Sequence, residues 1–73
     1  MLGIIGAMPE EVEQLKQEMD QVQVISAAGM EFYKGRLEGR DVVVVRCGVG
    51  KVNAAMCVQV LADRFEVNGI INT

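Results

Sequence analysis

Two adjacent carboxylates, Glu10 and Glu11, follow a short apolar run and are the residues of this chain best suited to chemistry. The run, residues 3–6, ends on a glycine, and Pro9 precedes the acids, so the pattern predicts a buried strand that turns directly into a helix. Open α/β sheets bind their ligands where strands end and helices begin. A carboxylate there, without a glycine-rich phosphate cradle, indicates a site that handles a proton or a water molecule. The same acids would also complement the helix dipole without any catalytic role.

The residue types argue against a phosphate-binding loop, a dinucleotide-binding site and a zinc site. A phosphate loop needs a glycine five places before Gly50 and a hydroxyl residue at position 52, and both places hold valine, Val45 and Val52. The first strand also lacks the paired glycines of a dinucleotide-binding fingerprint. Histidine is absent and no zinc-ligand spacing occurs, so we do not expect a zinc site.

The composition of the chain excludes some classes of binding partner and indicates a cellular compartment. The 73 residues carry a net charge of -3 without a basic stripe, which argues against nucleic-acid binding. We interpret the one basic cluster, Lys34, Arg36 and Arg40, as the solvated edge of a hairpin. No signal peptide and no apolar run long enough to span a membrane occur. Cys47 and Cys57 lie in apolar surroundings and are predicted to be reduced, buried thiols of a cytoplasmic protein.

The pattern of apolar and turn residues predicts the order β-α-β-β-β-α-β, hence an α/β fold with a mixed β-sheet flanked by helices. The expected strands are residues 1–7, 21–28, 30–37, 42–45 and 69–72, and the expected helices run from residue 8 to near Asp20 and over residues 51–65. The four valines at 42–45 predict a strand buried on both faces. The second helix is apolar over most of its circumference, so we expect it to be buried in a core or at a subunit interface.

The closing residues, 69–73, form an apolar strand with no helix or hairpin after it. Such a strand needs cover on both faces, and a domain of this length is only marginally stable alone. We therefore expect residues 1–73 to be the N-terminal portion of a single larger domain, the rest of which follows in the same protein or is supplied by another chain.

Two blocks of sequence resemble a known family. Residues 3–12, which read GIIGAMPEEV, are similar to the start of the bacterial 5'-methylthioadenosine/S-adenosylhomocysteine nucleosidases, and residues 47–55, CGVGKVNAA, are similar to their second block. The closing residues 70–73 resemble the strand that follows in that family. The resemblance implies the first third of a nucleoside-phosphorylase-like three-layer fold. It also implies hydrolysis of the N-glycosidic bond of both nucleosides to release adenine, without cofactor or metal, by a homodimer.

The resemblance also implies roles for particular residues. Glu11 matches the family's water-activating carboxylate, a general base that a helix N-terminus would keep ionised. Ala7 and Met8 match residues beside the ribose, and Val49 matches an apolar residue against the 5'-alkylthio group. Glu10 is interpreted as a solvated structural residue. The groups that protonate adenine and hold the ribose hydroxyls lie beyond Thr73 in the family, so the isolated chain is expected to be inactive.

Two other enzymes of the superfamily and one non-enzymatic function remain as alternatives. A futalosine hydrolase would share the fold, as would a nucleoside phosphorylase. Phosphorylases carry a Gly-Asp-Pro stretch and an arginine where this chain has residues 8–11, and a carboxylate there would repel phosphate. The third alternative is a non-catalytic association module that binds its partner through the second helix.

Overall fold

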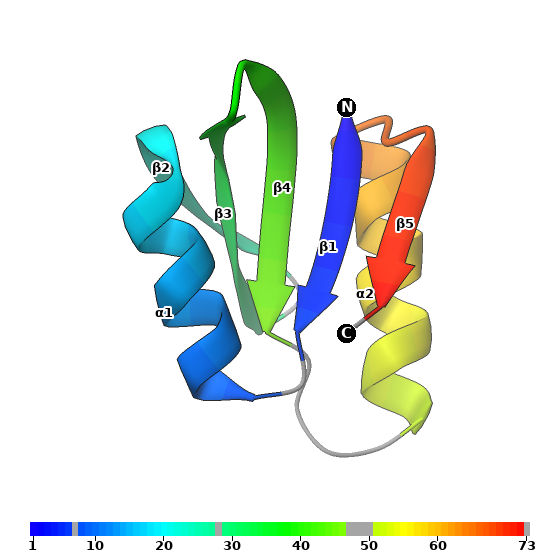
Figure 1. Ribbon diagram of the computed structural model, residues 1–73. Helices are drawn as coiled ribbons and strands as arrows, with labels where there is room; N and C mark the ends of the chain where they lie inside the picture. Colours follow the sequence, from blue (N-terminus) through cyan, green and yellow to red (C-terminus); the bar gives the residue numbers. More distant parts are fainter. Residues whose placement is uncertain (7, 28, 47–50, 73) are drawn as a thin grey trace.

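The computed structural model describes residues 1–6, 8–27, 29–46 and 51–72, the side chains of residues 51–54 and 72 excepted. The predicted element order is confirmed (Figure 1). The elements are β1 (Leu2–Gly6), α1 (Pro9–Glu18), β2 (Asp20–Ala27), β3 (Met30–Leu37), β4 (Arg40–Arg46), α2 (Lys51–Arg64) and β5 (Gly69–Asn72). Helix α1 ends at Glu18, so Asp20 belongs to β2 and not, as predicted, to the end of the helix.

A single mixed sheet organises the molecule, as predicted. Its five strands lie in the order β2-β3-β4-β1-β5, with β1 parallel to β4 and β5, and β3 antiparallel to β2 and β4. The register places Gly6 opposite Arg46 and Ile5 opposite Asn72. The carboxyl ends of β1, β4 and β5 therefore share one edge of the sheet, which is also where α1 begins (Figure 1).

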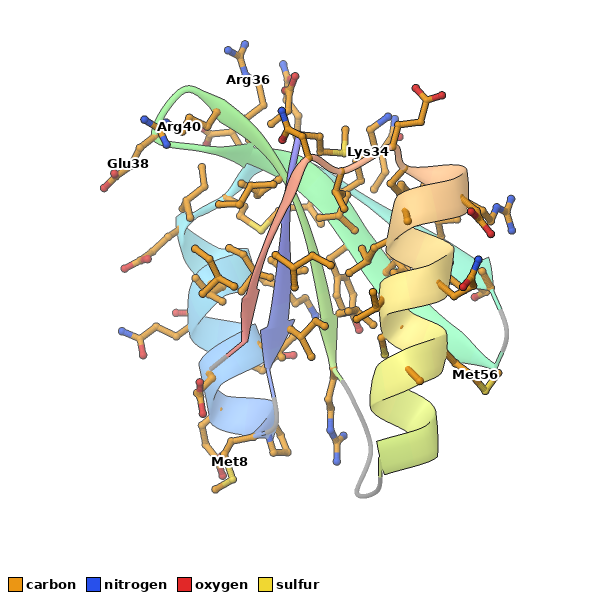
Figure 2. All side chains as sticks on the ribbon, turned by 90° about the vertical axis from the view of Figure 1, so that its right-hand side faces the viewer. Met8, Lys34, Arg36, Glu38, Arg40 and Met56 are labelled. Carbon is orange, nitrogen blue, oxygen red and sulfur yellow. The ribbon has the colours of Figure 1, made fainter. Side chains whose placement is uncertain are left out.

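The two helices cover opposite faces of this sheet (Figure 2). Alternation along β4 sends Val42 and Val44 to the α1 face and Val43 and Val45 to the α2 face. All four valines are at most 1% exposed, which confirms the prediction of a strand buried on both faces. The core on the α1 face also contains Ile4, Val12 and Met19, and the core on the α2 face also contains Ile5, Phe32, Cys57 and Leu61.

Helix α2 packs on the sheet along one stripe of side chains, so the predicted burial in a core is confirmed for that stripe. Among its described side chains only Cys57 and Leu61 are fully buried, whereas Met56 and Val58 are each 41% exposed. The reason is geometric, because a helix that packs on one face of a sheet buries one stripe of side chains. The proposed subunit interface on the outer face of α2 stays a prediction.

The last strand, β5, lies at the edge of the sheet that the structure describes, where it pairs with β1. Its Ile70 and Ile71 are 40% and 46% exposed, and the cover that the sequence predicts for this strand is not supplied by the described residues. The prediction that Cys57 is buried is confirmed, and its Sγ donates a hydrogen bond to Met30 Sδ at 3.1 Å. Cys47 lies outside the described residues.

The hairpin that joins β3 to β4 lies at the end of the sheet opposite the carboxyl ends of β1 and β4, and it carries the basic cluster. Glu38 and Gly39 join β3 to β4 with φ angles of 52° and 81°, the left-handed conformation that a tight two-residue hairpin turn requires. Arg36 donates a hydrogen bond to the carbonyl oxygen of Gly39 at 3.0 Å. Lys34, Arg36 and Arg40 are all exposed, which confirms the predicted solvated edge.

A bulge near the start of β2 accommodates the sharp entry from α1. Gln21 has a φ of 57°, and residues 21 and 22 of β2 stand opposite the single Gly35 of β3. A Cβ atom on Gly35 would lie 2.8 Å from the carbonyl oxygen of Asp20 and 3.0 Å from Met19 Cε. The bulge therefore requires glycine at position 35.

Gly35→Ala is expected to lower the free energy of unfolding by about 1–3 kcal/mol, because the new methyl group overlaps backbone that cannot move away. Gly69→Ala is the matched control, since its Cβ would meet only the mobile Leu2 Cδ1 at 3.3 Å. The control is expected to change stability by about 0.5 kcal/mol or less. Urea unfolding of both variants measures the difference, and equal losses would contradict the assignment of the bulge to Gly35.

Candidate active site

The carboxyl edge of the parallel strands is the place where the candidate site forms. Strands β1 and β4 end there at Gly6 and Arg46, and α1 begins there at Pro9. Met8 is the N-cap residue of α1, with φ −106° and ψ 137°, and its side chain makes no capping hydrogen bond. The positive end of the α1 dipole therefore faces the edge where α/β sheets bind ligands.

Glu11 lies in the first turn of α1 and is partly buried, whereas the neighbouring Glu10 is exposed. The reason for this difference is Val12, which is 4% exposed and packs into the core with Ile4 and Val44. Among the described residues, none forms an ion pair or hydrogen bond with the Glu11 carboxylate. Glu11 is thus a partly buried acid in the first turn of the helix that begins at this edge of the sheet.

Met8, the N-cap residue of α1, precedes Glu11 by three positions and lies at the same edge. Met8 is 54% exposed, and Figure 2 shows it at one end of the molecule, opposite the end that carries Arg36, Glu38 and Arg40. An exposed apolar side chain next to a carboxylate suits a ligand that carries both a sugar and an apolar group. The other two predicted site residues, Ala7 and Val49, lie outside the described residues.

Two open hollows lie at the other end of the sheet. One, of about 230 Å³, lies along β2 and β3 and is lined by residues that include Gln21, Lys34 and Arg36. The other, of about 320 Å³, lies beside Met1 and Asn68. Both adjoin the amino ends of β1 and β4, where open α/β sheets do not place their sites, so we assign no ligand to them.

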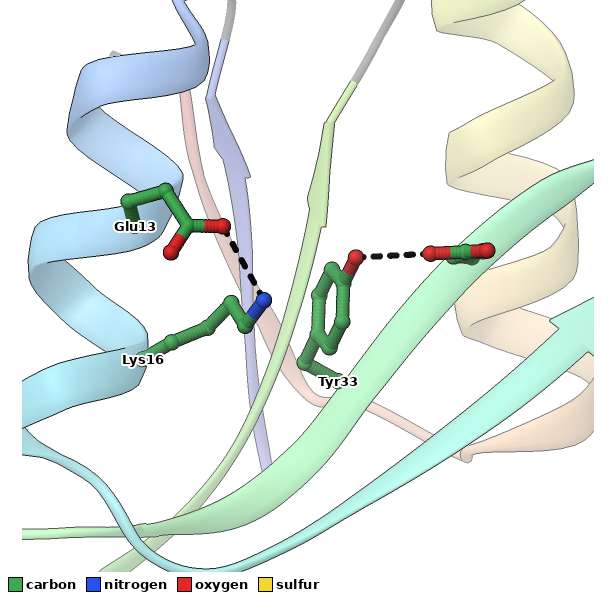
Figure 3. Close-up of polar contacts among 4 residues, drawn as sticks. Glu13, Lys16 and Tyr33 are labelled. Atoms are coloured by element: carbon green, nitrogen blue, oxygen red, sulfur yellow. Dashed lines mark hydrogen bonds and ion pairs between the residues drawn. The ribbon is translucent and has the colours of Figure 1, made fainter.

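Sequence reasoning missed a polar cluster that joins α1 to the sheet (Figure 3). Lys16 Nζ lies 4.2 Å from the centre of the Tyr33 ring and 3.1 Å from Glu13 Oε1. The Tyr33 hydroxyl donates a hydrogen bond to Glu31 Oε2 at 2.8 Å. The spacing of Glu13 and Lys16 is a detectable helical pair, but the contact with Tyr33 arises only when α1 packs on the sheet.

The two central groups of this cluster, the Lys16 ammonium and the Tyr33 hydroxyl, both have raised pKa values. The hydrogen bond to Glu13 raises the pKa of Lys16 above its ordinary value, and the hydrogen bond to Glu31, helped by burial, raises the pKa of Tyr33. When folding raises the pKa of a group, that group contributes stability to the folded protein. This stability is fully present at pH values below the pKa that the group has in the unfolded chain. That stability is lost as the pH rises through the folded pKa.

The melting temperature is therefore expected to fall as the pH rises above about 10, where Tyr33 titrates in the unfolded chain. Tyr33→Phe removes the titrating hydroxyl and keeps the ring over which Lys16 lies. The melting temperature of this variant is expected to fall by less than that of the wild-type protein between about pH 9 and pH 11. Thermal unfolding followed by circular dichroism measures the difference, and an identical pH dependence of the two proteins would contradict it.

Among the described residues, no helix is long and apolar enough to cross a membrane, and no group of three His, Cys, Asp or Glu side chains is placed to hold a metal ion. The groups at the described part of the edge include the Glu11 carboxylate, the exposed Met8 thioether, Arg46 at the end of β4 and the N-terminus of α1.

The model of the phosphorylase superfamily matches residues 1–73, which is the whole chain. The chain belongs to this superfamily. It is 51% identical over 72 residues to the 5'-methylthioadenosine/S-adenosylhomocysteine nucleosidase of Listeria monocytogenes serotype 4b, a match that covers 99% of this chain and 31% of the relative.

Solved structures of the phosphorylase superfamily share its fold. The nucleosidase of Colwellia psychrerythraea, solved in complex with adenine, matches with a TM-score of 0.93 and 45% identity over 97% of this chain and 29% of that one. The futalosine hydrolase of Helicobacter pylori matches with a TM-score of 0.87 and 25% identity over 99% of this chain and 31% of that one. The chain thus spans about a third of the length of these relatives, and it shares more sequence with the nucleosidases of Listeria and Colwellia than with this futalosine hydrolase.

Proposed function

We propose that residues 1–73 are the N-terminal portion of a nucleosidase that hydrolyses the N-glycosidic bond of 5'-methylthioadenosine and S-adenosylhomocysteine and releases adenine. The observation that carries the proposal is the position of Glu11, partly buried at the helix N-terminus on the carboxyl edge of the sheet. The similarity to nucleosidases at 45–51% identity supports the choice of substrates.

In the proposed reaction Glu11 accepts a proton from a water molecule while that water attacks the anomeric carbon of the ribose. The sugar becomes oxocarbenium-like as the bond to adenine lengthens, and adenine leaves after it gains a proton. From the resemblance to the nucleosidases we assign Met8 and Ala7 to the binding of the ribose and Val49 to the binding of the 5'-alkylthio group. The residues that protonate adenine belong to the part of the protein beyond residue 73.

The proposal includes the setting of this enzyme. We place it in the cytoplasm, in the salvage of methionine from adenosine thioethers. We also propose a homodimer, supported by the exposed apolar side chains Met56 and Val58, which lie on the two sides of the stripe of α2 that packs on the sheet. An apolar surface of this kind is typical of a face that another polypeptide covers.

The experiment that tests the function is an adenine-release assay on the complete protein with methylthioadenosine, S-adenosylhomocysteine and futalosine as substrates, each with and without phosphate. We expect release from the first two at rates that do not depend on phosphate, and little from futalosine. Strict phosphate dependence would replace the proposal by a phosphorylase, and preference for futalosine would replace it by a futalosine hydrolase. The isolated chain of residues 1–73 serves as the control and is expected to release no adenine.

A further inference from the structure

Few side-chain interactions hold α1 in its position on the sheet. Val12 is the one residue of α1 that is fully buried, and no side-chain capping bond fixes the start of the helix. Leu15 packs beside Val12 and is only partly buried. A helix held by one narrow apolar stripe can roll about its axis, so any contact on its flank sets its orientation.

The contact between Lys16 and Tyr33 lies on such a flank (Figure 3). Tyr33 belongs to β3, whereas Val12 packs over β1 and β4, so Lys16 holds the side of α1 that faces β3. Glu13 fixes the ammonium from within the helix at 3.1 Å. The Tyr33 hydroxyl donates a hydrogen bond to Glu31 at 2.8 Å, and the ring over which the ammonium lies packs against the core on the α1 face.

Glu11 stands on the opposite flank of the same helix. It precedes Lys16 by five positions, which corresponds to about 7.5 Å along the axis and about 140° around it. A side chain extends about 5–6 Å from a helix axis, so a roll of about 10° would move the Glu11 carboxylate by about 1 Å. A displacement of this size is enough to impair a general base that must meet a water molecule in line with the sugar.

We propose that Lys16 and Tyr33 are positioning residues that hold α1 in the orientation in which Glu11 activates water. The inference rests on the proposed function. Neither residue contacts the substrate, so their effect is confined to the placement of the Glu11 carboxylate. Arginine at position 16 would preserve both the contact with the ring and the ion pair with Glu13, whereas an uncharged side chain would lose both.

The test uses the complete protein and the kinetics of adenine release from methylthioadenosine. Lys16→Met and Tyr33→Leu are each expected to lower kcat by about two- to fivefold, the range that the loss of one exposed cation–π contact supports, with KM unchanged. Lys16→Arg and Tyr33→Phe are expected to keep the wild-type kcat. The double variant is expected to lose no more than either single variant, because the two side chains make one contact.

Lys34→Met is the matched control, because Lys34 is an exposed lysine of β3 that lies on the other face of the sheet from α1. It is expected to keep the wild-type kcat. Wild-type kcat in Lys16→Met or Tyr33→Leu would overturn the inference, even if their melting temperatures fall, because the role would then be purely structural. A failure of Lys16→Arg to restore kcat would also overturn it. Absence of adenine release by the wild-type protein would instead overturn the proposed function.

Discussion

Replacement of Glu11 by glutamine is expected to lower kcat for adenine release by about 10²–10⁴-fold, the usual contribution of a general base. Glutamine has nearly the same shape as glutamate and is as good a helix former, so α1 should fold as before. It cannot accept a proton from water, and the loss should therefore appear in kcat with KM little changed. Steady-state kinetics of the complete protein with methylthioadenosine measures both constants.

Glu10→Gln is the control for this experiment. It removes the same charge from the same helix turn, but Glu10 is exposed whereas Glu11 is partly buried. The interaction with the helix dipole is lost in both variants, so a difference in kcat isolates the catalytic role from the electrostatic one. A kcat for Glu10→Gln within about twofold of wild type is expected. Equal losses of kcat in the two variants would mean that both carboxylates act only by stabilising helix α1.

Phe32→Ala is expected to lower the free energy of unfolding by about 3–5 kcal/mol, the largest stability effect among the substitutions considered. Phe32 is 0% exposed at the centre of the core on the α2 face, and its ring lies 5.4 Å from that of Phe65 at 33°. Alanine would remove this contact and leave a cavity that the surrounding strands cannot close. Urea unfolding monitored by circular dichroism measures the change.

Val24→Ala provides the comparison, because Val24 is an apolar residue of the neighbouring strand that is 58% exposed. It is expected to change the free energy of unfolding by about 0.5 kcal/mol or less. Phe32→Leu, which keeps much of the volume, is expected to lie between the two. A loss below about 1 kcal/mol in Phe32→Ala would show that the core on the α2 face contributes little to the stability of the protein.

The order of the elements was predictable because each strand and helix carries a strong local signal. Residues 42–45 are four consecutive β-branched side chains, and such a run is suited to a strand covered on both faces. Pro9 marks the first position of α1, and Gly39 marks the hairpin turn. The placement of Glu11 at the edge of the sheet follows from these local signals alone.

Other features could not be predicted because they depend on how distant segments meet. The bulge in β2 places Gln21, a residue with no preference for positive φ, in the left-handed region, and only the pairing with β3 shows why. The apolar composition of α2 predicted burial, but burial depends on what packs against the outer face of a helix. The contact of Lys16 with Tyr33 joins residues 17 positions apart and has no local signature. The roles of Ala7 and Val49 stay predictions.

The claim that water is the attacking group is tested most directly by the mass of the sugar product. The complete protein is incubated with methylthioadenosine in water enriched in ¹⁸O, with phosphate present, and the products are analysed by mass spectrometry. The account predicts methylthioribose that carries one ¹⁸O atom from the solvent, formed by the wild-type protein and almost abolished in Glu11→Gln. A phosphorylated sugar, or wild-type rates of labelled product from Glu11→Gln, would contradict it.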